Sequence, residues 1–349
     1  MIIGACGFGS TGSSAVTDYL KEYNSFQVLD DIEFTWVSNV DGLIDLDHHV
    51  NKPHNRIMDS IMAIDSYKAM CKKNAKQYEV AGVSSKTIIK LTDDFLNSII
   101  DTSWEWRIHD SQNTIDRIRR SIYSRFSIVS RWEVKNGRHW EGYPLEKVFL
   151  SVLPAEFDEK AKKHVRDILM AIGADLSKPL ILDQPFAGNN PQACFKFFDD
   201  PYAVVVDRDP RDNYDFARTK LLGRFHLMPI NRVEDFVKYY RALRDNQPYK
   251  EVGNNRLLSI KFEDMVYHYE ETTARLRDFL HLPENPCPKS IFDPAISMPN
   301  TQVWKRFPQF QRDIEYIEKE LPEYLFDYTG CPEPDLNGKM FWGKSPKNN

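Results

Sequence analysis

The sequence predicts an α/β protein with a P-loop-like parallel sheet flanked by helices and a large helical insertion. Three observations support this fold class. The chain opens with an apolar run, residues 2–6, which leads through a glycine- and hydroxyl-rich loop into an apolar-periodic helix. Short apolar runs beside helical sequence return at 179–183, 202–206 and 256–261. Between residues 41 and 178, helical patterns dominate.

The elements follow in an order typical of such a sheet. A strand at 2–6, a helix at 13–22 and a second strand at 26–29 form one parallel unit. Helices are predicted at 55–76, 87–100, 114–130, 156–172 and 309–325, with one strand-like run at 148–153. We therefore expect a single domain over residues 1–349, with 41–178 as the mostly helical insertion.

Composition excludes several classes of protein. The 349 residues carry a formal net charge of −5 with both signs mixed, which argues against nucleic acid or an anionic membrane as partner. No run of eighteen apolar residues and no signal-peptide pattern is present, so we expect a cytoplasmic protein with no integral membrane segment. The five cysteines form no CxxC pair, which predicts no zinc site and no disulfide framework.

The loop at residues 7–14, Gly-Phe-Gly-Ser-Thr-Gly-Ser-Ser, predicts a phosphate-binding site. Its glycines let an anion approach the backbone, and free N–H groups converge there with the positive end of a helix. Hydroxyl groups add further donors. The alternative is a strand-to-helix turn that binds nothing, since single matches to glycine-rich patterns are common by chance.

Two known loop patterns fit this segment imperfectly. The Walker A spacing is present, but Ser13 stands where that motif needs its lysine, so a triphosphate kinase is disfavoured. Gly7, Gly9 and Gly12 also match the dinucleotide-binding fingerprint. Asp30 ends the second strand near the distance expected for a ribose ligand. An NAD(P)-dependent oxidoreductase therefore stays open.

A second candidate phosphate site follows the strand at 202–206. The segment 207–212, Asp-Arg-Asp-Pro-Arg-Asp, places Arg208 and Arg211 at the carboxyl end of a parallel strand, where open α/β sheets bind ligands. A guanidinium can grip a phosphate through two hydrogen bonds. The alternative is an Arg/Asp network that caps a helix starting at Pro210.

The order of these motifs resembles the sulfotransferase superfamily, whose donor is 3'-phosphoadenosine 5'-phosphosulfate (PAPS). Residues 10–14 are similar to the family's 5'-phosphosulfate loop, and 208–212 to its 3'-phosphate motif. Ile-Lys-Phe-Glu-Asp-Met at 260–265, followed by 275–282, resembles a further family segment. Thr-Gln-Val-Trp-Lys-Arg-Phe-Pro at 301–308 resembles the loop that folds back over the donor.

The resemblance implies transfer of a sulfuryl group from PAPS to a hydroxyl or amine, with 3',5'-adenosine bisphosphate (PAP) as product and no metal. It implies these donor-binding residues: Gly9, Ser10, Thr11, Gly12, Ser13, Ser14, Arg208, Arg211, Trp304 and Lys305. Ser10 departs from the family's usual basic residue, and Phe216 from a serine. Lys305 is a candidate to replace the missing loop cation. A non-catalytic relative that binds a nucleotide or glycan is the alternative.

Glu33 is the first candidate for the catalytic base, because some similar sulfotransferases carry a catalytic glutamate after the second strand. Its alternative role is to cap the following turn together with Asp30 and Asp31. His48 is the second choice, since other members use a histidine. It lies beside His49 in a polar stretch without metal-ligand spacing, where we expect an exposed turn.

The acceptor is expected to be a small molecule or a glycan, with a saccharide or glycan precursor as the class considered. The insertion, on the acceptor side, is rich in arginine over residues 107–140 and contains Trp132 and Trp140. A solvated helix face is the favoured interpretation of this stretch. A groove for an anionic or carbohydrate acceptor is the alternative.

Overall fold

The computed structural model describes residues 1–52, 58–106, 146–221, 228–245, 247 and 255–340. They belong to two compact units, each described by itself. The first consists of residues 1–39, 77–83 and 165–349, and the second of 40–76 and 84–164. The single domain expected over the whole chain stays a prediction.

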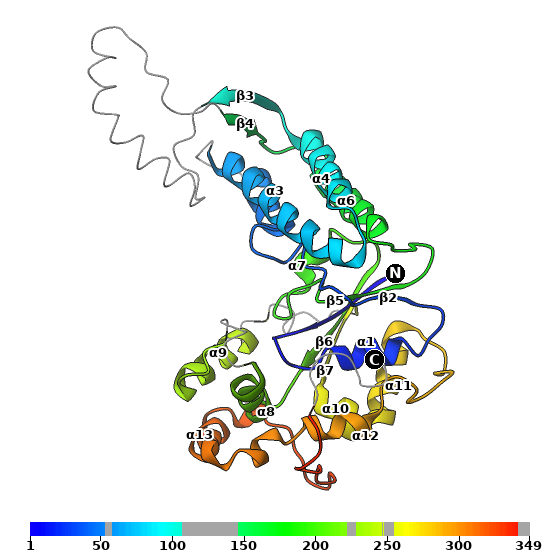
Figure 1. Cartoon of the computed structure of the whole chain (residues 1–349), viewed down its shortest axis with the longest axis vertical. Helices are drawn as coiled ribbons and strands as arrows, with labels where there is room; N and C mark the ends of the chain where they lie inside the picture. The colour runs from blue at the N-terminus through cyan, green and yellow to red at the C-terminus, as the bar shows by residue number, and fades with distance from the viewer. Residues whose placement is uncertain (53–57, 107–145, 222–227, 246, 248–254, 341–349) are drawn as a thin grey trace, which may run out of the picture. The chain divides into compact units, whose positions relative to one another are not determined.

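Within the described part of the first unit, five parallel strands form one sheet in the order β2-β5-β1-β6-β7. Figure 1 labels four of them, β2, β5, β6 and β7. The strands are β1 (Ile2–Gly7), β2 (Gln27–Leu29), β5 (Leu180–Asp183), β6 (Pro201–Asp207) and β7 (Leu257–Lys261). Because β1 is central, its residues 2–6 are buried, which explains their continuous apolar run. The predicted α/β class with a parallel sheet is confirmed.

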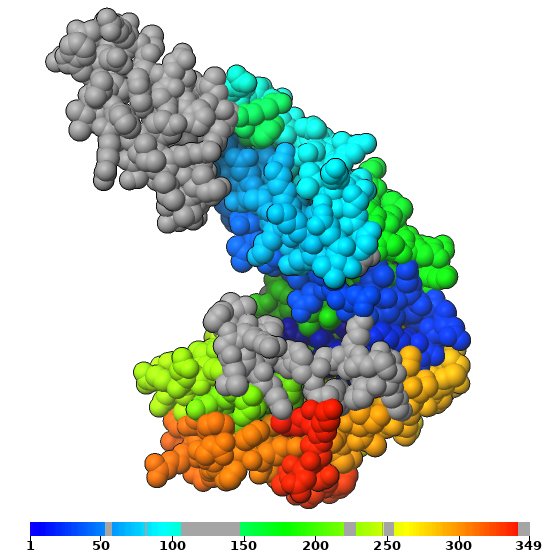
Figure 2. All heavy atoms as spheres, in the orientation of Figure 1, coloured from blue at the N-terminus to red at the C-terminus, as the bar shows by residue number. Residues whose placement is uncertain are grey.

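Helices of the first unit pack in two clusters. The helices α1 (Ser14–Leu20), α10 (Phe262–Tyr267) and α11 (Tyr269–Leu280) share a core with sheet residues such as Ile3 and Val204. The helices α8 (Pro210–Phe216), α9 (Val233–Asp245) and α13 (Gln311–Glu320) share another core. In the space-filling view, the orange atoms of α13 lie against the yellow-green atoms of α9 (Figure 2).

Short helices and turns complete the first unit. They are η1 (Glu79–Ala81), α7 (Gln192–Phe195), the π-helical η2 (Ala217–Leu221), α12 (Pro294–Ser297), η4 (Met298–Asn300), η5 (Val303–Arg306), η6 (Pro308–Phe310) and η7 (Pro322–Tyr324). The helix predicted over 309–325 is shorter than expected. Pro322 has no N–H to continue α13 and begins η7 instead.

The second unit contains the helices α2 (Leu43–Asn51), α3 (Met58–Tyr78), α4 (Ser85–Ile99) and α6 (Phe157–Ala171), of which α3 and α6 run past its boundaries. The strands β3 (Thr102–Trp106) and β4 (Glu146–Leu150) pair antiparallel. The sequence predicted a strand near β4 but not β3. The predicted helix at 114–130 lies outside the described residues, and no described helix could span a membrane.

The exposed turn expected around His48 and His49 is wrong. These residues lie within α2, a helix that buries Leu43, Leu46 and Val50. The spacing of these three apolar residues places them on one face of the helix. The polar residues between them made the stretch look like a turn.

Candidate functional site

A cavity of about 570 Å³ lies in the first unit, at the carboxyl edge of the sheet. Its lining comes from segments that follow all five strands of that sheet, with described residues from 7–18, 33–39, 183–188, 208–216, 228–239 and 262–300. Open parallel sheets bind their ligands at this edge. The cavity is therefore the first place to look for a ligand site.

The β1–α1 loop, residues 7–14, forms part of this lining. The N–H groups of residues 9–14 donate no hydrogen bond to any described residue. The loop turns at Gly9 and Gly12, whose φ angles are 86° and 88°. A Cβ atom at Gly12 would come within 2.5 Å of the Phe262 ring. The loop thus places residues with unused backbone donors in the lining of the cavity, which is what an anion site requires.

Gln184 holds the loop from the neighbouring strand β5. Its Nε2 donates to Ser13 Oγ at 2.9 Å, and its Oε1 accepts from the Gly7 N–H at 3.2 Å. Gln184 has a positive φ of 51°, directly after the last residue of β5. Sequence reasoning gave it no role, although it lies between an aspartate and a proline at a strand end.

Two residues after β6 hold the loop's carbonyl groups. Asn213 Nδ2 donates to the carbonyl oxygen of Gly9 at 3.1 Å, and Arg208 Nη1 donates to that of Ser10 at 3.1 Å. Sequence reasoning missed Asn213. Because these side chains bind carbonyl groups, they fix the loop without using its N–H donors.

Arg208 is buried and also lines the cavity. Its Nη2 donates to the carbonyl oxygen of Asn300, while its Nε has no hydrogen-bond partner. The rings of Phe216 and Phe262 lie 4.8 and 5.2 Å from its guanidinium carbon. Phe216, which departs from the family's serine, therefore packs against the guanidinium. Arg208 keeps hydrogen-bonding capacity for a ligand.

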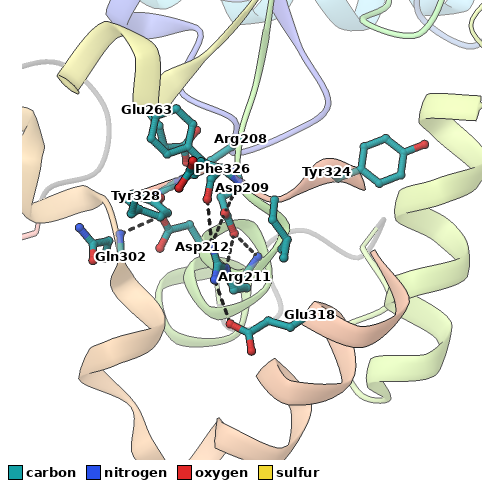
Figure 3. Close-up of polar contacts among 12 residues, drawn as sticks. Arg208, Asp209, Arg211, Asp212, Glu263, Gln302, Glu318, Tyr324, Phe326 and Tyr328 are labelled. Atoms are coloured by element: carbon teal, nitrogen blue, oxygen red, sulfur yellow. Dashed lines mark hydrogen bonds and ion pairs between the residues drawn. The ribbon is translucent and has the colours of Figure 1, made fainter. Parts of the chain in front are cut away.

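Arg211 makes its own set of contacts, and Figure 3 shows its polar bonds to Asp209 and Glu318, with Arg208 nearby. We call this set the α8 cluster, and its members are Asp209, Arg211, Asp212, Glu318, Trp304 and Tyr328. Arg211 donates from Nε and Nη2 to the Asp209 carboxylate at 2.9 and 2.7 Å, and from Nη1 to Glu318 at 2.9 Å. Burial lowers its pKa, but the bonds to Asp209 outweigh that effect and raise it. Arg211 and Asp209 thus form the Arg/Asp network that was the alternative to a phosphate site in the segment 207–212.

The C-terminal loop residues lie with this cluster. The Trp304 ring is 4.1 Å from the Arg211 guanidinium carbon, and Trp304 is buried. Lys305 Nζ pairs with both carboxylate oxygens of Glu333 at 2.7 and 2.8 Å. Neither residue lines the cavity, nor does Arg211. The predicted contacts of these residues with the donor, and Lys305 as the loop cation, stay predictions.

Asp212 connects the α8 cluster to the backbone of the C-terminal loop. Its carboxylate accepts from the N–H of Gln302 at 2.9 Å, from that of Val303, and from the Tyr328 hydroxyl at 3.2 Å. Burial raises the pKa of Asp212 to about 7, although the charge of Arg208 acts in the opposite direction. These bonds give the segment after η4 a structural role.

Glu33 lines the cavity in the segment that follows β2. The N–H of Phe34 donates to the carbonyl oxygen of Asp183 at 2.9 Å, which ties this segment to β5. Glu33 is solvent-exposed on one side, while the protein atoms around its carboxyl desolvate it and raise its pKa. Its position is compatible with the predicted role as base.

His48, the second candidate, lies on α2 in the second unit. Its Nδ1 is 2.8 Å from Lys52 Nζ, and it is not among the residues that line the cavity. Its predicted role as the second-choice base stays a prediction.

The dinucleotide interpretation fails on topology. In the dinucleotide-binding fold the second strand is the neighbour of the first, whereas β5 separates β2 from β1 here. Asp30 does not line the cavity, and its carboxylate pairs with Lys21 at 2.5 Å. The expected ribose ligand is therefore not placed at the loop.

In comparisons with known proteins, no family model and no curated protein matches the sequence. A sulfotransferase domain from the curacin biosynthetic pathway is similar in structure, with 12% identity, a TM-score of 0.36, and coverage of 82% of this chain and 75% of that one. A sulfotransferase from Mycobacterium avium has 12% identity and a TM-score of 0.36 over 97% of this chain and 78% of that one.

A sulfotransferase from Mycobacterium tuberculosis is also similar, with 12% identity, a TM-score of 0.31, and coverage of 81% of this chain and 67% of that one. All three solved structures belong to the class that the sequence motifs resemble. With TM-scores below 0.5, these similarities do not establish what the chain does.

Proposed function

We propose that the protein is a PAPS-dependent sulfotransferase, which transfers a sulfuryl group to a hydroxyl or amine of a small-molecule or glycan acceptor. One observation carries the proposal. A single cavity joins the unused N–H groups of residues 9–14, the Arg208 guanidinium and the Glu33 carboxylate. These are the groups needed to bind two phosphate-type anions and to accept a proton.

Binding of the donor follows from the first two groups. The backbone N–H groups of the loop bind the 5'-phosphosulfate, and Arg208 binds the 3'-phosphate through its remaining N–H donors. Among the described lining residues, Arg208 supplies the only lysine or arginine side chain. Neutral N–H groups held in place by Gln184 and Asn213 therefore carry most of the stabilisation of charge on the transferring group.

Glu33 accepts the acceptor's proton during transfer. The acceptor oxygen or nitrogen forms a bond to sulfur, the bond from sulfur to the bridging oxygen breaks, and PAP leaves with that oxygen. The pKa of Glu33 is raised by desolvation, which makes this carboxylate a stronger base. Because catalysis needs the deprotonated form, turnover should rise with pH through that raised pKa.

Thermal denaturation in the presence of PAP, NAD or ATP tests donor binding. PAP should stabilise the protein by about 2.7 kcal/mol at a hundredfold excess over its Kd, and the other two should have smaller effects. Stabilisation by NAD alone would overturn the proposal. Transfer of label from PAPS to an acceptor mixture then separates an enzyme from a protein that only binds the nucleotide.

A further inference from the structure

Acidic residues line both sides of the cavity, but among the described lining residues arginine is found on one side only. Because β5 and β2 lie on one side of β1 and β6 and β7 on the other, the segments that follow these strands line opposite sides of the loop. The β6–β7 side contributes Arg208, which lies between two aromatic rings, and also the acidic residue Asp293. The β2–β5 side contributes Glu33 and Asp183 as its charged lining residues, and none of the described lining residues on that side is basic.

The β2–β5 side also has unused hydroxyl groups. Thr35 and Ser38 line the cavity, and their hydroxyls make no hydrogen bond to a described residue. A hydroxyl can both donate and accept, so it pairs well with the hydroxyl or amine of a ligand. Polar groups that are neutral or negative thus face the space beside the loop.

We infer that this side selects an acceptor that is uncharged or carries an amine, such as a neutral sugar or an amino sugar, and rejects an anionic acceptor. The inference rests on the proposed function, because it assumes that the donor fills the Arg208 side. Two negative side chains disfavour a carboxylate or sulfate on the acceptor, and the bound donor adds its own negative charge. An ammonium group on the acceptor would instead be attracted by these negative charges.

Labelled transfer to a defined mixture tests this selectivity. The protein receives PAPS labelled in its sulfuryl group together with equal amounts of neutral sugars, amino sugars, amino alcohols and uronic acids. Ion exchange at neutral pH then separates the products by charge. We expect the label in products that are uncharged or singly negative, at least about tenfold above those made from uronic acids. Predominant labelling of uronic acids would overturn the inference.

The variant Asp183→Asn tests the cause of the selectivity. It should raise the yield of uronic acid products relative to neutral ones by about tenfold and leave the affinity for PAP unchanged. The matched control is Asp278→Asn, which removes a carboxylate exposed on α11, outside the cavity, and should leave the product ratio unchanged. An unchanged ratio in Asp183→Asn would contradict the electrostatic explanation.

Failure of the proposed function gives a different result. If PAP does not stabilise the protein, donor binding is wrong, and the selectivity inference is lost with it. If PAP stabilises the protein but no product is labelled, the transfer step is wrong and this inference falls as well. If products form with the opposite charge preference, only the selectivity inference fails.

Discussion

The β1–α1 loop and the segment 207–212 at the start of α8 look alike in the sequence and differ in the structure. Both combine polar residues with the start of a helix after a buried strand, and both were predicted to contribute to donor binding. The N–H groups of residues 9–14 have no described partner, whereas the N–H groups of Arg211 bind Asp209, Glu318 and the carbonyl oxygen of Phe326. A glycine-rich loop or an arginine can bind a ligand only if its N–H groups are not already bonded within the protein.

Arg208 shows how close the two regions are in the chain. It precedes α8 and lines the cavity, while Arg211 lies in the first turn of α8 and reaches the Asp209 carboxylate. Asp209 is fully buried, so its charge has to be balanced within the protein. Arg211 provides that balance, whereas the Nε of Arg208 has no hydrogen-bond partner among the described residues.

The largest expected effect is a loss of kcat when the carboxylate of the cavity is replaced, but not when a carboxylate of the α8 cluster is replaced. Glu33→Gln should lower kcat by about 10²- to 10⁴-fold, because the amide cannot accept the acceptor's proton. The affinity for PAP should not change. Steady-state kinetics and calorimetric titration with PAP measure the two quantities.

Glu318→Gln is the matched control for this substitution, because Glu318 is a carboxylate of the α8 cluster and does not line the cavity. We expect its kcat to stay at the level of the unmodified protein. Unchanged turnover in Glu33→Gln would remove Glu33 from the mechanism. Equal losses in both variants would show that the two regions are not functionally distinct.

The second prediction compares the two arginines through the same substitution. Arg208→Lys keeps a positive charge but loses the planar fork, so the Kd for PAP should rise about tenfold, or about 1.4 kcal/mol. Arg211→Lys should leave that Kd unchanged and lower the Tm, because it breaks bonds to buried Asp209.

Calorimetric titration and thermal denaturation of both variants measure these effects. The comparison fails if Arg211→Lys weakens PAP binding as much as Arg208→Lys does. It also fails if Arg208→Lys changes only the Tm.

The sequence predicted what depends on local pattern. Apolar runs identified the strands of the sheet, and the glycines of residues 7–14 identified a loop whose backbone an anion can approach. Contacts between distant residues were not predictable in the same way. Glu318 is 107 positions from Arg211, and Gln184 is 171 positions from Ser13. Only the folded chain shows that Arg211 donates to Glu318 and that Gln184 holds Ser13.

Asp215 is a polar residue that lies outside the cavity and whose carboxyl group has no hydrogen-bond partner in the described part of the chain. It lies on α8, is fully buried, and neither carboxyl oxygen has a hydrogen-bond partner among the described residues. It does not line the cavity. Burial raises its pKa to about 7, and the charge of Asp212 adds to this effect. We therefore expect a neutral acid here rather than a ligand site.

This expectation gives a pH dependence of a definite sign. The folded protein holds the proton of Asp215 up to a pKa of about 7, whereas the unfolded chain loses it near the ordinary value of about 4. The stabilising contribution of the protonated group is thus complete at low pH and lost as pH rises between these values. Asp215→Asn cannot ionise, so its Tm should increase relative to that of the unmodified protein as pH rises through that window, and the difference should persist at higher pH.

Asp278→Asn provides the control for loss of one carboxylate, and thermal denaturation across this pH range measures both variants. A Tm difference that does not grow with pH would mean that Asp215 is ionised in the fold and that its balancing charge lies outside the described contacts.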